Sequence, residues 1–102
     1  MLIEFTVSPV GAGESLSADV AAVVDLVDRS GLPYVLTPMS TVAEGEWDEL
    51  MALVKRCHEL LRARHARVVT AIKIDDRQGA SGRISGKIDA VEQKLGRRVN
   101  RI

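Results

Sequence analysis

The sequence predicts an α+β fold in which helices cover one face of a four-stranded antiparallel sheet, with an extra helix at the C-terminal end. Three observations lead to this prediction. Leu2 to Ser8 alternates apolar and polar residues with the period of a strand. Two later segments repeat apolar residues at helical spacing. Prolines and glycines between these segments mark turns and short strands.

The length and composition indicate a single domain, residues 1–102, with a modest core. Lys plus Arg number 14 and Asp plus Glu number 14, so no general attraction to nucleic acid or to a membrane surface is expected. No apolar run approaches the roughly 20 residues that span a bilayer. The first ten residues lack the basic region and cleavage site of a signal peptide. We therefore expect a cytoplasmic protein with neither a nucleic-acid nor a membrane partner.

The N-terminal third predicts a strand, a glycine-containing connection and a helix. Ile3, Phe5 and Val7 share one face of the strand, and Pro9 ends its hydrogen-bond ladder. Ser15 or Ser17 is predicted to cap the helix through its hydroxyl. The apolar stripe of that helix consists of Val20, Val23, Val24 and Val27. Gly31 suits the left-handed position that follows a helix.

The middle of the chain predicts a hairpin and a second helix. Tyr34 to Thr37 and Thr41 to Glu44 read as two short strands joined by a turn at residues 38–40. Acidic residues after Gly45 oppose the positive end of the helix dipole. The predicted apolar stripe of this helix consists of Trp47, Leu50, Leu53, Val54, Cys57, Leu60 and Leu61.

The C-terminal third predicts a fourth strand and a weak helix. Arg67 to Asp75 reads as a strand. The helical stripe that follows consists of Ile84, Ile88, Val91 and Leu95. Gly82 and Gly86 weaken it by roughly 1 kcal/mol for each interior glycine, so the helix should depend on docking. The tail, residues 97–102, is predicted to be loose.

The order βαββαβ is that of a ferredoxin-like fold. Right-handed crossovers place the first and third strands at the centre and both main helices on one face. The opposite face should carry polar residues of the first strand beside apolar residues of the fourth: Glu4, Thr6, Ser8, Val69, Ala71 and Lys73. Because this face is partly apolar, we expect self-association over it or along an edge strand.

The hairpin and the first strand together supply a candidate ligand site. A carboxylate, several hydroxyls and an aromatic ring suit a small cationic heteroaromatic ligand, with a cation–π contact of roughly 0.5–2 kcal/mol. The ligand-binding residues predicted on this basis are Tyr34, Thr37, Met39, Thr41, Glu44, Glu4, Thr6 and Ser8. The alternative is that this segment only forms a hairpin, in which proline favours the turn and threonine favours the strands.

Other possible sites are weaker. Cys57 lies on an apolar stripe, and His58 and His65 have no third ligand at a recognisable spacing, so no metal site, cofactor or catalytic residue is predicted. The segment Gly82 to Ile88 is one residue short of a phosphate-binding loop and lacks its hydroxyl. Asp75 and Asp76 could hold a divalent cation, but a solvated turn is favoured. An RNA-binding sheet is disfavoured because the central strands offer only Phe5 as an aromatic.

Several motifs resemble the small thiamine-binding proteins of bacteria and archaea, over nearly the whole chain. The matching segments are Glu4 to Pro9, Ser30 to Gly45, His58 and Val69 to Arg77. This resemblance implies a ferredoxin-like fold, assembly into dimers or tetramers, and non-enzymatic binding of thiamine or its hydroxymethylpyrimidine half. The positions carried over are Tyr34, Thr37, Met39, Thr41 and Glu44. The chain departs from the common pattern at Ser40, Gly82 and Gly86.

The function predicted from the sequence is therefore a non-catalytic small-molecule binding protein whose ligand is thiamine or its pyrimidine moiety. The alternative is an oligomeric regulatory module that binds another small metabolite. That alternative rests on analogy with other ferredoxin-like domains, which often pair their sheets and bind effectors between them.

Overall fold

The computed structural model describes residues 1–11, 13 and 16–101. It contains four strands and three helices: β1 (Leu2–Pro9), α1 (Ser17–Arg29), β2 (Tyr34–Leu36), β3 (Thr41–Glu44), α2 (Trp47–Arg64), β4 (Val68–Asp75) and α3 (Arg83–Leu95). The predicted α+β element order is confirmed. No helix in the described part of the chain has the length and apolar character needed to cross a bilayer.

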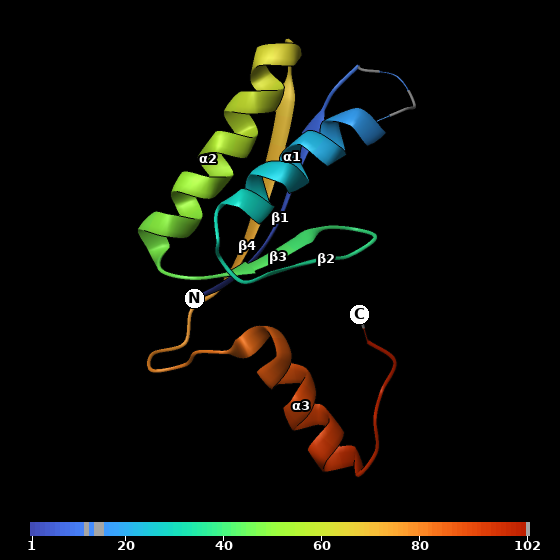
Figure 1. The fold of residues 1–102 in the computed structure, drawn as a ribbon, viewed down its shortest axis with the longest axis vertical. Helices are drawn as coiled ribbons and strands as arrows, with labels where there is room; N and C mark the ends of the chain where they lie inside the picture. Colours follow the sequence, from blue (N-terminus) through green and yellow to red (C-terminus); the bar gives the residue numbers. More distant parts are fainter. Residues whose placement is uncertain (12, 14–15, 102) are drawn as a thin grey trace.

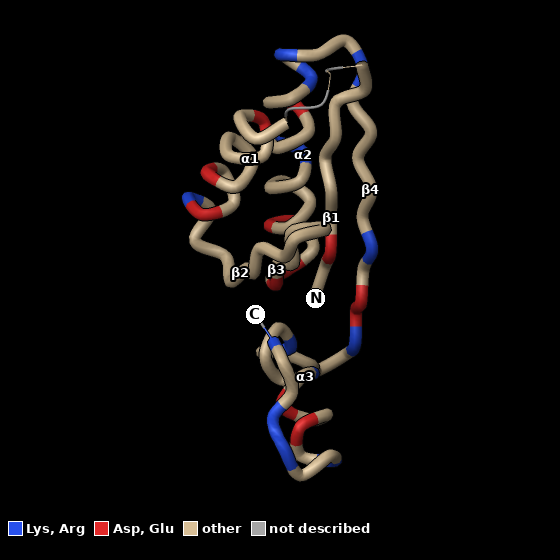
Figure 2. The backbone as a smooth tube through the Cα atoms, turned by 90° about the vertical axis from the view of Figure 1, so that its right-hand side faces the viewer, with Lys and Arg blue, Asp and Glu red and all other residues tan. Residues whose placement is uncertain are grey.

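The four strands form one sheet in the order β2-β3-β1-β4, and β1 pairs antiparallel with both β3 and β4. The predicted central and edge strands are confirmed. Helices α1 and α2 lie together on one face of the sheet, as the two views in Figure 1 and Figure 2 show. This is the ferredoxin-like arrangement, with the other sheet face left without a helical layer.

The core lies between this sheet and the two helices. Strand β1 contributes Ile3 and Phe5, which alternate with the exposed Glu4, and β3 contributes Ala43. Helix α2 supplies most of the remaining buried surface because its apolar residues recur every three or four positions. The buried residues of the two helices are Val23, Val27, Leu50, Leu53, Val54, Cys57 and Leu61.

The structure contradicts the predicted cap at Ser17 and the predicted place of Trp47 in the buried stripe. Leu16, not a serine, precedes the first turn of α1; Ser17 is the first helical residue and makes no capping bond, while Ser15 lies outside the described residues. Trp47 is 54% exposed although it continues the helical stripe of α2. It is the first residue of that helix, one turn before the buried part begins at Leu50. Periodicity alone does not show where a helix meets the sheet.

The register leaves part of β1 uncovered. Strand β3 pairs with β1 only between Leu2 and Phe5, whereas β4 pairs with it from Leu2 to Pro9. The edge of β1 from Thr6 to Pro9 therefore extends beyond the end of β3 on the hairpin side. Backbone N–H and C=O groups at such an edge require other partners.

Helix α3 lies beyond the end of the strands, away from the layer formed by α1 and α2 (Figure 1). None of its residues is buried. The described part of the tail folds back on it, which contradicts the predicted loose end. Val99 N donates to Glu92 Oε2 at 2.9 Å, and Arg101 contacts Asp89 at 2.8 Å and Glu92 at 3.0 Å.

The buried Cys57 makes stability depend on pH. Burial raises the pKa of its thiol to about 11, whereas an exposed thiol has a pKa of about 8.5. Between about pH 9 and pH 11 the unfolded chain therefore loses this proton first, and the free energy of unfolding falls as the pH rises. We expect urea denaturation to show a smaller decline over this range for Cys57→Ala than for the wild type. Equal declines would contradict this role of the thiol.

Candidate ligand site

A pocket of about 180 Å³ lies where β1 runs past the end of β3. Its walls are the free edge of β1, one side of α1 and the hairpin turn between β2 and β3. Five of the eight predicted site residues line it: Thr6, Ser8, Thr37, Met39 and Thr41. The hairpin thus folds beside the first strand as predicted, and most of the proposed constellation converges.

The hairpin turn is held by the Thr37 hydroxyl. Thr37 Oγ1 accepts hydrogen bonds from Ser40 N at 3.0 Å and from Met39 N at 3.2 Å, and Thr37 N donates to Ser40 O at 2.9 Å. Ser40 Oγ then donates to Glu4 Oε2 at 2.9 Å, which bonds the turn to β1. These contacts fix the turn as one wall of the pocket and place the Glu4 carboxylate next to a pocket-lining residue.

Exposed apolar side chains gather around this pocket. Val20 from α1 is 50% exposed, Leu36 from β2 is 44% exposed and Met39 at the turn is 85% exposed, and all three line it. Single exposed apolar residues are common on protein surfaces, whereas a cluster around a depression is typical of a binding site. The pocket therefore combines apolar walls with hydroxyl groups and a strand edge.

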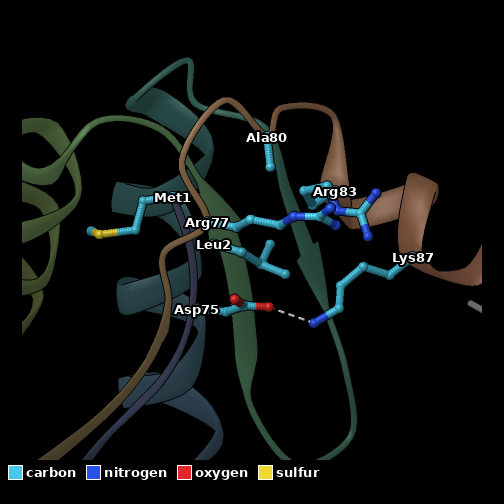
Figure 3. A pocket seen from close by; sticks show the side chains of 7 residues that line it. All are labelled: Met1, Leu2, Asp75, Arg77, Ala80, Arg83 and Lys87. Carbon is cyan, nitrogen blue, oxygen red and sulfur yellow. Dashed lines mark hydrogen bonds and ion pairs between the residues drawn. The ribbon is translucent and has the colours of Figure 1, made fainter.

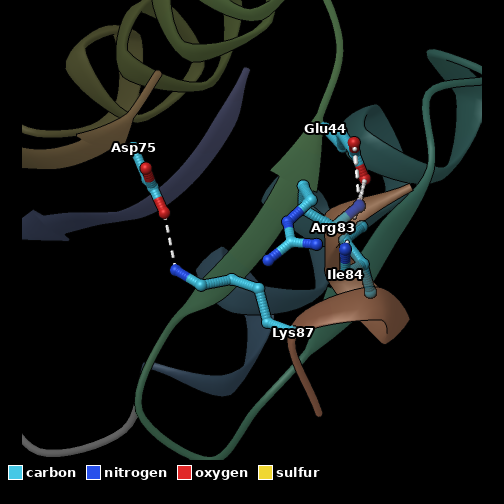
Figure 4. Close-up of polar contacts among 5 residues, drawn as sticks. All are labelled: Glu44, Asp75, Arg83, Ile84 and Lys87. Carbon is cyan, nitrogen blue, oxygen red and sulfur yellow. Dashed lines mark hydrogen bonds and ion pairs between the residues drawn. The ribbon is translucent and has the colours of Figure 1, made fainter. Parts of the chain in front are cut away.

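The Glu44 carboxylate lies elsewhere. Glu44 Oε1 and Oε2 accept hydrogen bonds from Arg83 N at 2.9 and 3.0 Å, and Oε1 also accepts from Ile84 N at 3.2 Å (Figure 4). A carboxylate in this position satisfies free N–H groups at the start of α3 and opposes its dipole. Glu44 thus bonds α3 to the end of β3 and does not line the pocket beside Thr6 and Ser8.

Tyr34 also lies apart from the pocket. Its hydroxyl donates to Asp28 Oδ1 at 2.9 Å, and this hydrogen bond raises the pKa of the phenol. Strand parity separates the two residues: Tyr34 pairs with Ala43 on the helix-covered face, whereas Glu44 pairs with Leu2 on the open face. Both border a second, more open depression of about 500 Å³ at the end of the hairpin. Within the described part of this chain, the eight predicted residues therefore do not all line one pocket.

Sequence reasoning missed the apolar wall formed by Val20, Val24 and Leu36. The helical spacing predicts that both valines of α1 face the core, but Val20 is half exposed and lies beyond the core. A signal was present in the sequence, because the predicted first strand (Leu2 to Ser8) is longer than the predicted third strand (Thr41 to Glu44). When two paired strands differ in length, part of the longer strand's edge stays unpaired. Helix residues next to that part have no neighbouring strand to pack against.

The two histidines have polar partners away from the pocket, and Cys57 is buried in the core. His58 Nδ1 lies 2.6 Å from Thr70 Oγ1, which joins α2 to β4. His65 Nε2 lies 2.9 Å from Asp19 Oδ2 and joins the end of α2 to α1. Within residues 1–11, 13 and 16–101 no group of three potential metal ligands comes together.

Comparison with known proteins agrees with the fold. A family model described as thiamine-binding protein matches residues 3–92. A UPF0045 protein of Mycobacterium bovis is 40% identical over 96 residues, covering 93% of this chain and 94% of the relative. A UPF0045 protein of Methanothermobacter thermautotrophicus is 41% identical over 95 residues, covering 90% and 96%.

Solved structures share the same architecture. A hypothetical protein of Methanocaldococcus jannaschii superposes with a TM-score of 0.83 at 29% identity, covering 90% of this chain and 95% of that one. A Thermotoga maritima structure, described provisionally as a thiamine biosynthesis/salvage protein, has a TM-score of 0.77 at 24% identity and covers 88% and 96%. The second likeness bears on the fold alone. Because the family model spans almost the whole chain and relatives reach 40% identity, this protein belongs to the thiamine-binding protein family.

Proposed function

We propose that the protein binds thiamine or its hydroxymethylpyrimidine moiety, without catalysis, in the pocket between β1, α1 and the hairpin turn. The observation that carries the proposal is the convergence of exposed apolar side chains and hydroxyls on the uncovered edge of β1. Membership of a family described as thiamine-binding supports the choice of ligand.

The chemistry of the pocket suits an aminopyrimidine. Such a ring is flat and carries hydrogen-bond donors and acceptors in its plane, which match the N–H and C=O groups of a free strand edge. Val20 and Leu36 supply apolar surface for the ring faces, and the hydroxyl-bearing residues Thr6 and Ser8 line the same pocket. The pocket volume of about 180 Å³ suits one ring, with the rest of a larger ligand extending over Met39.

The carboxylate of Glu4 would interact electrostatically with a positive charge on the ligand. This carboxylate accepts from Ser40 Oγ at 2.9 Å, and Ser40 lines the pocket. Glu4 is exposed and faces the open side of the sheet, so its contribution is modest and screened by salt. Of the two carboxylates predicted for the site, Glu4 and not Glu44 takes the electrostatic role in this proposal.

Isothermal titration tests the proposal directly. We expect saturable heat with thiamine and with hydroxymethylpyrimidine, and little with a thiazolium alcohol that lacks the pyrimidine. Absence of both heat and a thermal shift at millimolar thiamine would contradict the proposal. Binding of an amino acid by an oligomer that ignores thiamine would favour the regulatory alternative.

We also infer that copies of the chain associate into dimers or tetramers along β4. This outer strand is eight residues long, and its apolar side chains are incompletely covered: Val69 is 49% exposed, Ile72 39% and Ile74 41%. A long apolar edge strand offers unpaired backbone groups to a second copy. Native mass spectrometry should show an even-numbered oligomer, and a monomer at working concentration would contradict the inference.

A further inference from the structure

A second, strongly basic pocket lies at the opposite end of β1 from the proposed ligand site. It has a volume of about 120 Å³ and is lined by the end of β4, the segment that follows β4, and α3. Arg77, Arg83 and Lys87 project into it from these segments, and Asp75 lies at its edge (Figure 3). It shares no lining residue with the pocket between β1, α1 and the hairpin.

The charges in this pocket are unbalanced. Three basic side chains line it together with one carboxylate, that of Asp75. Lys87 Nζ donates to Asp75 Oδ2 at 2.5 Å, but within the described residues neither Arg77 nor Arg83 has a carboxylate within ion-pair distance of its guanidinium. The hydrogen bond from Lys87, together with the charges of Arg83 and Arg77, lowers the pKa of Asp75. All three cations therefore act on the same small space.

Two guanidinium groups around a small concavity are suited to a phosphate. Arginine presents N–H donors in a planar fork that matches phosphate oxygens, and such charge-assisted bonds are short and strong. The backbone N–H groups at the start of α3 are not the anion ligands here, because Glu44 already accepts from Arg83 N and Ile84 N. Recognition must therefore come from the side chains.

An apolar depression adjoins the basic pocket. It has a volume of about 570 Å³, lies on the open face of the sheet and shares Leu2, Arg83 and Lys87 with the basic pocket. Its apolar lining comes from Val35 and Val42 of the sheet and from Ile84 and Ile88 of α3. An anion held by the arginines would thus place an attached ring against apolar surface.

We propose that this pocket binds the phosphate group of a small phosphorylated metabolite whose apolar ring lies in the adjoining depression. The site is separate from the proposed thiamine pocket and does not depend on it. It assigns a function to the basic residues around α3, none of which enters the pocket at the hairpin.

Isothermal titration at low salt with inorganic phosphate and with phenyl phosphate tests this proposal. We expect phenyl phosphate to bind about tenfold more tightly than inorganic phosphate, since about 1.4 kcal/mol from the buried ring corresponds to a factor of ten. Equal affinities would mean that the pocket recognises phosphate alone and not an attached ring, and this would overturn the proposal. No binding of either probe at millimolar concentration would also overturn it.

Charge variants supply the controls. Arg77→Gln and Arg83→Gln should each weaken phenyl phosphate binding about tenfold, the loss expected for one charge-assisted contact. Asp75→Asn should strengthen it, because this change removes the one carboxylate that lines the pocket and frees Lys87. Arg98→Gln, in the exposed tail, should leave it unchanged.

Two outcomes of the charge variants would refute the site. Weaker binding by Asp75→Asn would mean that the carboxylate organises the pocket instead of competing with the anion. An equal loss in Arg98→Gln and Arg77→Gln would mean that phosphate responds only to overall charge. Far-UV circular dichroism of each variant shows whether α3 is retained, and Arg77→Gln lies outside that helix.

Discussion

Replacing Val20 with tryptophan should abolish thiamine binding while leaving the fold intact. Val20 lies on the outer part of α1, is 50% exposed and lines the pocket at the free edge of β1. An indole ring at this position occupies the space proposed for the pyrimidine ring without entering the core. We expect the affinity for thiamine to fall by roughly a hundredfold, equivalent to about 2.7 kcal/mol.

Val91 offers a matched control for this change. It is also a helical valine with 50% exposure, but it lies on α3 and does not line the pocket. Val91→Trp should therefore bind thiamine with wild-type affinity in the same isothermal titration. A wild-type affinity in Val20→Trp, or an equal loss in both variants, would show that the ligand does not occupy this pocket.

Replacing Glu44 with alanine should release α3 from the sheet. The carboxylate accepts hydrogen bonds from Arg83 N and Ile84 N, whereas α3 has no buried residue and its ion pair with β4, between Lys87 and Asp75, is solvent-exposed. Loss of a carboxylate cap costs roughly 0.5–2 kcal/mol. A 13-residue helix is marginal in isolation, so this loss is large relative to its stability.

Hydrogen exchange measures the release of α3 segment by segment. In Glu44→Ala the amides of residues 83–95 should exchange rapidly, while those of β1 and α2 keep their protection. Glu4→Ala is the control, because it removes a carboxylate from the same open face without touching α3. Unchanged protection of α3 in Glu44→Ala would contradict its role as the cap, and thiamine affinity should be unaffected because Glu44 lies outside the pocket.

The fold could be predicted from the sequence because each element carries a local signal. Alternation at Ile3 and Phe5 marked the central strand, and the spacing of the α2 stripe marked the main helix. The right-handed crossover rule then left one strand order. The N-cap of α1 could not be predicted. Capping preferences favour a serine, but Leu16 occupies the N-cap position and Ser17 is already the first helical residue.

The candidate site was predicted in part, for a geometric reason. Thr6, Ser8, Thr37, Met39 and Thr41 lie close together because the hairpin folds back beside β1. Tyr34 and Glu44 belong to the same sequence motif but point to opposite faces of the sheet, and neither lines this pocket. The basic pocket was not predicted, because it depends on where the segment after β4 places α3 relative to the sheet.

Mapping amide chemical shifts during a titration with thiamine tests the central claim most directly. The account expects the largest changes at residues 6–8 of β1, 20–24 of α1 and 37–41 of the hairpin, with residues 83–88 of α3 nearly unchanged. Shifts confined to residues 77–88, or no shifts at millimolar thiamine, would contradict the placement of the ligand at the free edge of β1.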